Sequence, residues 1–297
     1  MRPIGSECAV ALEVDGHSVA LPFTEETLRV QPILEVREPL LGLAVPRFDL
    51  TRRSVTAGCV VTRAGRCSFP ALLHACLGCR EEPVHVPESR GMFSTGFSLA
   101  EEIDGFPQFD LVADRGVERL RYPGLRARGF ELRGLVSEPL YLRVDVCGGE
   151  AAADFDPVPE LAEEEHFYFE PGAVVVDGVV MAGVYQFAFA VDTGLQWYAG
   201  GRARYGEKSV TFTMHAPLDE AVAEVLGRES HTVELFFELR DTFPEPNRPP
   251  TFSFHLEDMF LRKEQKEPDS PGELCSPYLF AGRGAVTAQA VSEEMPS

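Results

Sequence analysis

Turn residues divide most of this chain into short segments in which apolar and polar residues alternate. This alternation is the side-chain period of a β-strand with one buried face, and short segments bounded by Gly, Pro, Asn and Asp are typical of antiparallel strands. We therefore expect a mainly β fold. The expected strands are residues 29–36, 43–50, 56–62, 93–99, 109–113, 129–135, 140–146, 173–180, 184–191, 210–215, 232–240, 251–261 and 285–291. The turns between them include VDG at 14–16 and again at 176–178, YPG at 122–124, CGG at 147–149 and DTG at 192–194.

Two segments depart from this alternation and have the spacing of a short helix instead. Their apolar residues recur at i, i+3, i+4, i+7 and i+8, which is one face of an α-helix. The first set is Phe69, Leu72, Leu73, Cys76 and Leu77, and the second set is Leu218, Ala221, Val222, Val225 and Leu226. Ser68 is a candidate N-cap of the first helix, and Gly78 and Gly227 follow the last turns. Helices of about ten residues are unstable alone, so each must pack its apolar stripe against the sheet.

The chain repeats this organisation once in each half. Each expected helix follows a basic residue and the letters Ser-Val-Thr, at 53–56 and 208–211, and ends in Leu-Gly. Beyond the helices, an amphipathic strand, a proline-containing connection and a second strand occur at 96–113 and at 235–258. For 297 residues, two domains are the default expectation. We predict two tandem β-barrel or sandwich domains, each with one short flanking α-helix, at residues 1–150 and 151–297.

Two polar segments lie between or beyond the expected strands. The acidic, proline-containing stretch 148–165 has the composition of a linker, and most of it belongs to the start of the second domain. Residues 263–278 are polar and contain three prolines, which favours a mobile loop or an extended arm.

The net charge of −20 is unevenly distributed along the chain. Residues 1–150 hold 17 basic and 21 acidic side chains, whereas residues 151–297 hold 10 and 26. Proteins that grip nucleic acid neutralise its phosphates with Lys and Arg, so this balance argues against static binding of DNA or RNA. An acidic wall would still let DNA slide past without sticking, and solubility alone is the simpler explanation of the charge.

The sequence contains no apolar run of membrane-spanning length and no signal-peptide pattern, so we expect an unsecreted, soluble protein. Its seven cysteines are an odd number in a chain of this size, which favours reduced thiols in a cytoplasm. Cys76 and Cys79 have the spacing of half a zinc site, and a matching second pair is missing. Cys76 also takes the place in the helical stripe that Val225 fills in the second copy, which favours a structural thiol.

The alternative chemistry for this region is a thiol nucleophile with a histidine base. The neighbouring cysteines and histidines are Cys59, Cys67, His74 and His85. The sequence has no GxSxG motif, no phosphate-binding GxxxxGK[ST] loop and no GxGxxG motif. We therefore predict that the protein is not an enzyme, has no catalytic or metal site and uses no cofactor.

Two segments suit assembly with other subunits. In the strand 232–240, Glu234 and Glu238 lie on one face and apolar residues on the other, as expected for a strand that lines an acidic pore or for an ordinary solvent-exposed strand. The segment 195–208 is rich in the residue types of interface hot spots, although a hairpin that caps the core would look similar. The candidate interface residues are Trp197, Tyr198, Arg202, Arg204 and Tyr205.

In its order of elements, the sequence resembles the tail tube proteins of long-tailed, siphovirus-type bacteriophages, in the variant that carries two tandem tube domains. The resemblance covers residues 25–147 directly and residues 165–291 through the internal repeat. The chain departs from the pattern in its long acidic linker and in lacking a Tyr-x-Gly turn in the second half. The stretches that carry the resemblance are VTAGCVV with a helix ending in ALLHACLG at 71–78, FSTGFSLAEEIDGFPQFDLVADRG at 93–116, and YPGLRARGFELRG at 122–134.

The resemblance implies subunits that form rings, which stack head to tail into a hollow tube for DNA. Two domains per chain imply a trimeric ring with pseudo-sixfold symmetry, whereas single-domain relatives form hexamers. Partners would be other copies of the chain, other tail proteins and double-stranded DNA in transient, non-specific passage through an acidic channel, with no membrane involved. The implied location is the virion tail, after assembly in the host cytoplasm.

Two other functions remain open on the sequence alone. A monomeric virion decoration or baseplate protein, or a ligand-binding β-sandwich, would contain the same strands without forming rings. A thiol- or metal-dependent enzyme centred on Cys76 and Cys79 is the other alternative.

Overall fold

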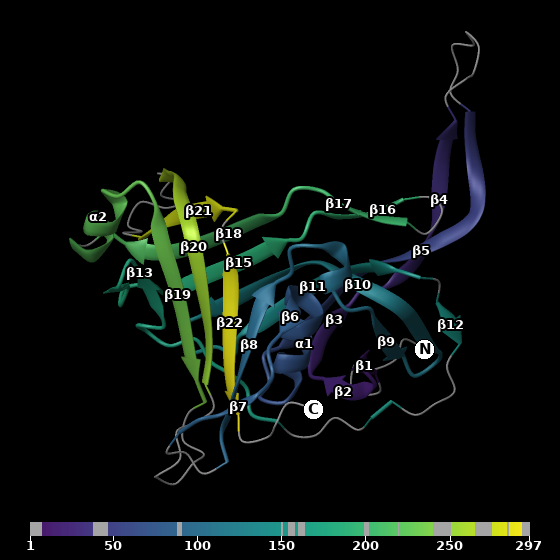
Figure 1. The fold of residues 1–297 in the computed structure, drawn as a ribbon, viewed down its shortest axis with the longest axis horizontal. Coiled ribbons are helices and arrows are strands. Elements are labelled where there is room, and N and C mark those ends of the chain that lie inside the picture. The colour runs from purple at the N-terminus through teal and green to yellow at the C-terminus, as the bar shows by residue number, and fades with distance from the viewer. Residues whose placement is uncertain are drawn as a thin grey trace.

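The computed structural model describes residues 8–37, 47–87, 91–149, 151–153, 158–159, 164–198, 202–218, 220–239, 251–264, 275–283 and 285–292. The protein is mainly β: of the described residues, 64% are in strands and 8% are helical, and the strands form a large open antiparallel sheet that folds over itself into layers (Figure 1). The expected mainly β fold with two short flanking α-helices is therefore confirmed.

One broad layer runs through both halves of the chain, and we call it the wide sheet. Its neighbouring strands are all antiparallel, and β10 and β20 contribute only their C-terminal halves. In spatial order it contains β3 (Phe23–Glu26) and β4 (Arg29–Arg37) at one edge, then β5 (Arg47–Arg63), β11 (Tyr141–Gly148), β10 (Arg119–Leu135), β15 (Gln186–Asp192), β18 (Ser209–Pro217), β21 (Cys275–Gly282) and β20 (Thr251–Glu264).

Two smaller sheets cover one face of the wide sheet. Each includes the N-terminal half of a long bent strand, β10 or β20, whose C-terminal half belongs to the wide sheet. The first back sheet has the order β2 (His17–Leu21), β1 (Ala9–Val14), β9 (Phe109–Asp114), β10 and β12 (Ala152–Ala153). The second has the order β14 (Val179–Val180), β13 (Val174–Val176), β19 (His231–Glu238), β20, β22 (Val286–Ser292) and β8 (Phe93–Leu99), with β6 (Gly78–Arg80) and β7 (Val84–His85) on the far side of β8.

The two halves of the chain have the same order of strands. Each begins with a hairpin, β1–β2 or β13–β14, whose turn is Asp-Gly with both residues at positive φ: 50° and 81° at Asp15 and Gly16, 52° and 80° at Asp177 and Gly178. A turn with positive φ at both central residues matches the twist of a two-residue hairpin and favours Asp-Gly, which accounts for VDG at both places. Each half then supplies the first strand position of its part of the wide sheet (β3 and β4, or β15), a strand followed by a helix (β5 or β18), and a bent strand shared between two layers (β10 or β20), whereas β6, β7 and β8 have no counterpart among the described residues of the second half.

The helices confirm most of the predicted stripes. In α1 (Ser68–Leu77), all five stripe residues are buried. The helix begins one residue earlier than expected: Ser68 is inside it, and the carboxylate of Glu164 accepts hydrogen bonds from the backbone N–H of Cys67 and Ser68. Gly78 ends the helix at φ 94°. In α2 (Glu220–Leu226), Val222 and Val225 are buried, but Leu218 precedes the helix and is 59% exposed, so its predicted core position is wrong.

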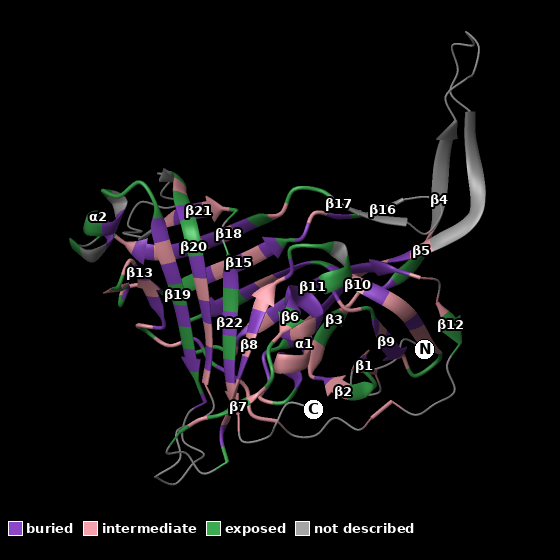
Figure 2. Ribbon diagram, viewed as in Figure 1, coloured by how far each residue is buried: buried purple, intermediate pink, exposed green. Residues whose placement is uncertain are grey.

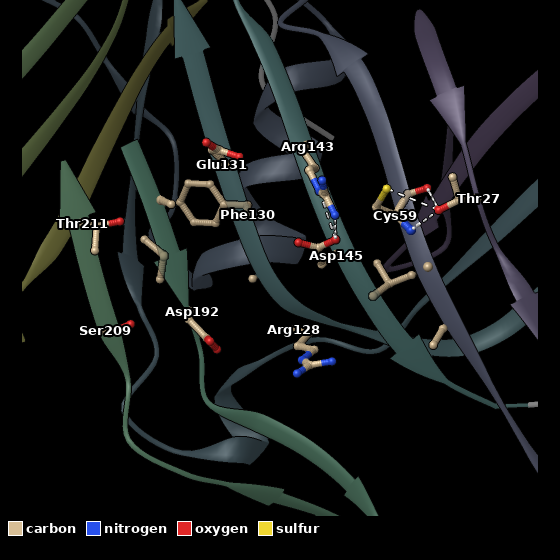
Figure 3. A pocket seen from close by; sticks show the side chains of 16 residues that line it. Thr27, Cys59, Arg128, Phe130, Glu131, Arg143, Asp145, Asp192, Ser209 and Thr211 are labelled. Atoms are coloured by element: carbon tan, nitrogen blue, oxygen red, sulfur yellow. Dashed lines mark hydrogen bonds and ion pairs between the residues drawn. The ribbon is translucent and has the colours of Figure 1, made fainter. Parts of the chain in front are cut away.

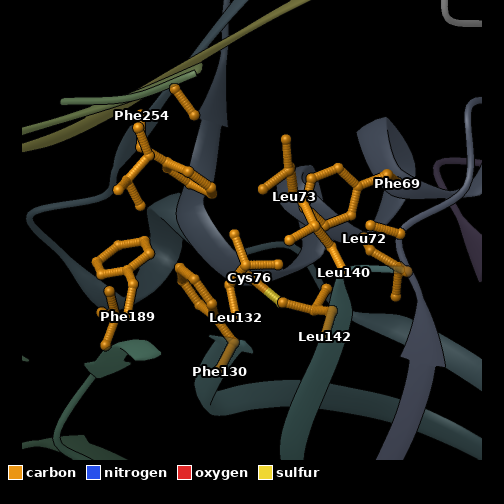
Figure 4. Close-up of a cluster of buried hydrophobic side chains, with 14 of the residues drawn as sticks. Phe69, Leu72, Leu73, Cys76, Phe130, Leu132, Leu140, Leu142, Phe189 and Phe254 are labelled. Atoms are coloured by element: carbon orange, nitrogen blue, oxygen red, sulfur yellow. The ribbon is translucent and has the colours of Figure 1, made fainter. Parts of the chain in front are cut away.

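A single hydrophobic core lies between the layers and draws on both halves of the chain. Phe130 of the wide sheet packs edge to face on Phe189 at 5.5 Å between ring centroids, and Phe189 packs on Phe254 at 4.9 Å (Figure 4). Phe69 of α1 lies 4.4 Å from Phe252. The first and second halves are therefore packed against each other as well as paired through β10–β15 and β8–β22. The division at residue 150 stays a prediction.

Several strand predictions are corrected by the pairings. Ser-Val-Thr is not equivalent in the two copies, because Thr56 is buried in β5 whereas Val210 is buried in β18. The matched stretches 96–113 and 235–258 also differ, since β8 pairs with β22 whereas β19 pairs with β20. The arm predicted at 263–278 lies partly within β20 and β21, and residues 265–274 lie outside the described residues. Strands β1, β2 and β3 were not expected, and a short 3-10 helix spans Ile103–Gly105.

Candidate assembly surface

The joint between β10 and β15 connects two equivalent parts of the wide sheet. Block 1 has the order β3/β4, β5, β11, β10, and block 2 has the order β15, β18, β21, β20. At the joint, seven residues from Gly129 to Leu135 pair with Asp192 to Gln186. The backbones approach so closely that a Cβ on Gly129 would lie 2.7 Å from the carbonyl oxygen of Val191. The wide sheet is thus two four-strand blocks joined edge to edge.

The same two kinds of edge are left open at the ends of the wide sheet. Within the described residues, β3 and β4 pair only with β5, and the C-terminal half of β20 pairs only with β21. These edges correspond to β15 and to the C-terminal half of β10 in the joint. An open edge presents unpaired backbone N–H and C=O groups, which readily pair with another chain.

An exposed phenylalanine and a depression mark the β20 edge. Phe260 is 50% exposed, and Arg262 follows it on the same face. They border a depression of about 970 Å³ over β18, β21 and β20. A similar depression of about 520 Å³ lies over β5, β11 and β10, and there β15 forms the remaining side (Figure 3). At the opposite edge, Val30 of β4 is 44% exposed.

The hairpin of β16 (Leu195–Tyr198) and β17 (Arg202–Tyr205) carries the predicted interface residues. In the sequence, this hairpin follows β15 and precedes β18. It projects beyond the body of the sheet, as does the hairpin of β4 and β5 (Figure 1). The register places Trp197 opposite Ala203 and Tyr198 opposite Arg202. The side chains of Trp197, Tyr198, Arg202, Arg204 and Tyr205 lie outside the described residues, so their interface role stays a prediction.

Glu234 and Glu238, the candidate channel acids, lie on β19. Both are exposed, together with Phe236, while the alternate residues are buried (Figure 2). His255 of β20 lies 3.6 Å from Glu234. This outward face belongs to the second back sheet, the layer opposite the wide sheet. The two acids therefore do not share a surface with the depressions, and their lining of a channel stays a prediction.

The open face of the wide sheet carries arginine and acid pairs in block 1. Arg143 lies 3.0 Å from Asp145, and Arg133 lies 2.7 Å from Glu131. These hydrogen bonds raise the pKa of both guanidinium groups. Arg128, Asp192 and Thr211 complete the polar border of the depression in Figure 3.

Two aspartates in the repeated turns bind the hairpins to neighbouring segments, α1 in the first half and the start of β19 in the second. Asp15 accepts a hydrogen bond from His74 of α1 at 2.8 Å. Asp177 lies 2.9 Å from Nδ1 of the buried His231, accepts the Thr232 N–H at 2.8 Å and lies 3.4 Å from Arg228 beyond α2. Burial raises the pKa of Asp177, but these hydrogen bonds and positive charges outweigh it, so the pKa is lowered overall. The pairs stabilise the repeat.

The cysteines and histidines of residues 59–85 are not gathered at one place. Cys76 is fully buried in the core, where burial strongly raises the pKa of its thiol, whereas Cys79 is exposed. Cys59 contacts Thr27 at 3.3 Å, and His85 packs edge to face on Phe93. Among the residues that the structure describes, no group of three or more His, Cys, Asp or Glu side chains is placed to hold a metal ion.

Sequence reasoning missed Phe260, Val30, Gly129 and Glu164. The pattern of the strand predicted at 251–261 could have identified Phe260 as an exposed apolar side chain. That this strand lies at the edge of the sheet follows only from the strand pairing. Glu164 had no local signal, because its hydrogen bonds reach a helix 96 residues earlier in the chain.

Comparison with known proteins leaves the family open: no protein-family model matches the chain, and no curated protein matches it. Within the described residues, no helix has the length and apolar character that crossing a membrane requires. Any statement about function therefore depends on the fold and its surfaces.

Proposed function

We propose that this protein is a structural subunit of a bacteriophage tail tube, which forms rings that stack around a channel for DNA. The observation that carries the proposal is the edge-to-edge joint within the chain. Block 1 and block 2 already pair through β10 and β15, and the free edges at the two ends are of the same two kinds. A second copy would repeat the joint by placing its β3 and β4 beside the β20 edge of the first.

Such a contact joins unlike surfaces, so it generates a closed ring if the rotation closes and a filament if it does not. Three copies would supply six blocks. Since the resemblance implies rings of six single-domain subunits, we expect a trimeric ring with pseudo-sixfold symmetry. Open edges are a liability for a monomer, and ring closure removes them. The β4–β5 and β16–β17 hairpins project away from the sheet and are suited to contact the next ring, which is where Trp197 and Tyr198 would act.

In this arrangement the open face of the wide sheet lines the channel, and the back sheets face outward. Glu234 and Glu238 would then lie on the outside of the tube rather than in its channel. In this proposal the protein has a structural role in the virion tail. Its partners are further copies of the chain, other tail proteins and the DNA that passes through the channel.

Electron microscopy of the purified full-length chain, combined with sedimentation over a concentration series, tests the proposal. We expect rings that contain three copies, with stacked tubes at high concentration. A Phe260→Glu variant, which places a charge at the edge, should stay monomeric while keeping its strand signal in circular dichroism. A monomer at every concentration would instead favour a decoration or ligand-binding protein.

A further inference from the structure

The open face of block 1 has an excess of arginine in a chain that is otherwise strongly acidic. Residues directly opposite each other in an antiparallel pair share a face, so the register places these side chains together. In one row, Arg63 and Arg133 flank Tyr141. In the next row, Arg143 lies between Val61 and Glu131. The charged side chains described on this face are Arg29, Arg63, Arg126, Arg128, Arg133 and Arg143, against Glu25, Glu131, Asp145 and, across the joint on β15, Asp192.

The paired arginines remain accessible. The side chain of Arg133 is 61% exposed and that of Arg143 is 46% exposed, although each contacts a carboxylate. The carboxylates hold the guanidinium groups in place without covering them. Arg63 is exposed and has no ion pair within the described part of the chain. Arginine presents several N–H donors in a planar fork, which suits phosphate oxygens.

Block 2 has a different lining at the equivalent strands. Its outward side chains at the centre of β15, β18 and β21 are small or uncharged, namely Ala188, Ala190, Thr211, Thr213 and Ala281. The row Glu131, Ala190, Thr211 runs across the joint from the charged block into the neutral one. A ring of three chains would therefore alternate three arginine-bearing arcs with three arcs that are uncharged at their centre and carry charges of both signs at one end, namely Asp192, Glu207, Asp258, Arg262 and Arg283.

The overall charge of −20 does not cancel the local excess. Exposed charges farther apart than about 10 Å are largely screened at an ionic strength of roughly 0.1 M. Glu234 and Glu238 lie on the outward face of the opposite layer, with the core between them and the arginines. A phosphate at the open face of block 1 therefore responds mainly to the arginines beside it.

We propose that the arginine-bearing open face of block 1 is a weak contact surface for the phosphates of duplex DNA. This inference rests on the proposed tube function, which places the face toward the channel. The channel wall would then not repel DNA uniformly. It would bind the duplex weakly at the three arginine-bearing arcs and make no such contact between them. The arginine–acid pairs keep the contact weak, because each carboxylate competes with phosphate for the same guanidinium.

Fluorescence anisotropy with a labelled duplex, measured over a salt series, tests the contact. Each neutralised phosphate contributes about 0.9 to the slope of log K against log salt for duplex DNA. The double variant Arg63→Gln, Arg133→Gln should therefore weaken binding about tenfold at low salt and reduce the slope by about 2. Arg228→Gln is the matched control, because Arg228 is 43% exposed but lies beyond α2, away from the wide sheet. It should leave both values unchanged.

Absence of DNA binding by the wild-type chain at low salt would overturn the inference, as would equal losses in the double variant and the control. Competition by polyglutamate as effective as competition by duplex would assign the surface to an acidic polypeptide and also overturn it. Microscopy of the same samples separates the two proposals: intact rings without arginine-dependent binding refute only the DNA contact, whereas arginine-dependent binding by a permanent monomer refutes the tube.

Discussion

Replacing Phe260 by alanine should weaken ring formation strongly while leaving the subunit folded. A phenylalanine side chain presents roughly 200 Å² of surface, so about 100 Å² of Phe260 is open at 50% exposure. Covering most of this area with a neighbouring strand stabilises each joint by about 2 kcal/mol, at roughly 25 cal/mol per Å². Three joints close a trimeric ring, so the variant loses about 6 kcal/mol per ring. Because trimer formation depends on the square of the concentration, its midpoint should rise by roughly two orders of magnitude.

Sedimentation velocity over a concentration series measures this midpoint. The matched control is Phe236→Ala, since Phe236 is 45% exposed but lies on the outward face of β19 in the second back sheet. Both variants remove a similar exposed ring, and neither residue is part of the core. The control should shift the midpoint less than about threefold. Equal shifts in the two variants, or no shift for Phe260→Ala, would show that the β20 edge does not form the joint.

Three further changes test other parts of the fold. Asp177→Asn should destabilise the protein by about 1–3 kcal/mol in urea unfolding, because it weakens the contacts to His231 and Thr232. Since the pKa of Asp177 is lowered in the folded protein, this contribution is present above its unfolded pKa of about 3.9 and is lost as the pH falls through the folded value; a difference between wild type and variant that does not shrink as the pH is lowered would refute the assignment. Glu164→Ala should cost about 1 kcal/mol by leaving the start of α1 uncapped, measured against Glu165→Ala, whose side chain is 37% exposed. Cys76→Ser should cost about 1–3 kcal/mol by placing a hydroxyl in the core, whereas Cys79→Ser should change stability by less than about 0.5 kcal/mol, and the reverse order would contradict a structural role for Cys76.

Local patterns predicted the elements whose cause is local. The stripe from Phe69 to Leu77 has a helical period, and all its residues are buried in α1. VDG occurs twice because both turns need positive φ at Asp and Gly. The strand predicted at 93–99 agrees with β8 in both bounds. In each of these cases, the physical reason acts within a few residues of the sequence.

The predictions that failed depend on contacts between distant segments. Leu218 fits the helical stripe, but α2 begins after it at Glu220, so its side chain stays in solvent. The cap of α1 comes from Glu164, on a segment that crosses from the second half of the chain. Cys76 and Cys79 are close in sequence, yet one faces the core and the other faces solvent. The candidate assembly surface is of the same kind, because an edge is defined only once every pairing is known.

The two blocks have kept the same strand order while their open faces have become different. In the proposed ring, equal strand order would allow one kind of joint to connect blocks within a chain and between chains, because the backbone of β10 or β20 would meet the same kind of partner in each case. The side chains on the open face do not affect that pairing, so they are free to differ. A fused pair can therefore place arginines in one block and small neutral residues in the other, which six identical single blocks cannot do. Two blocks in one chain would thus give the proposed ring closely similar joints and an alternating lining.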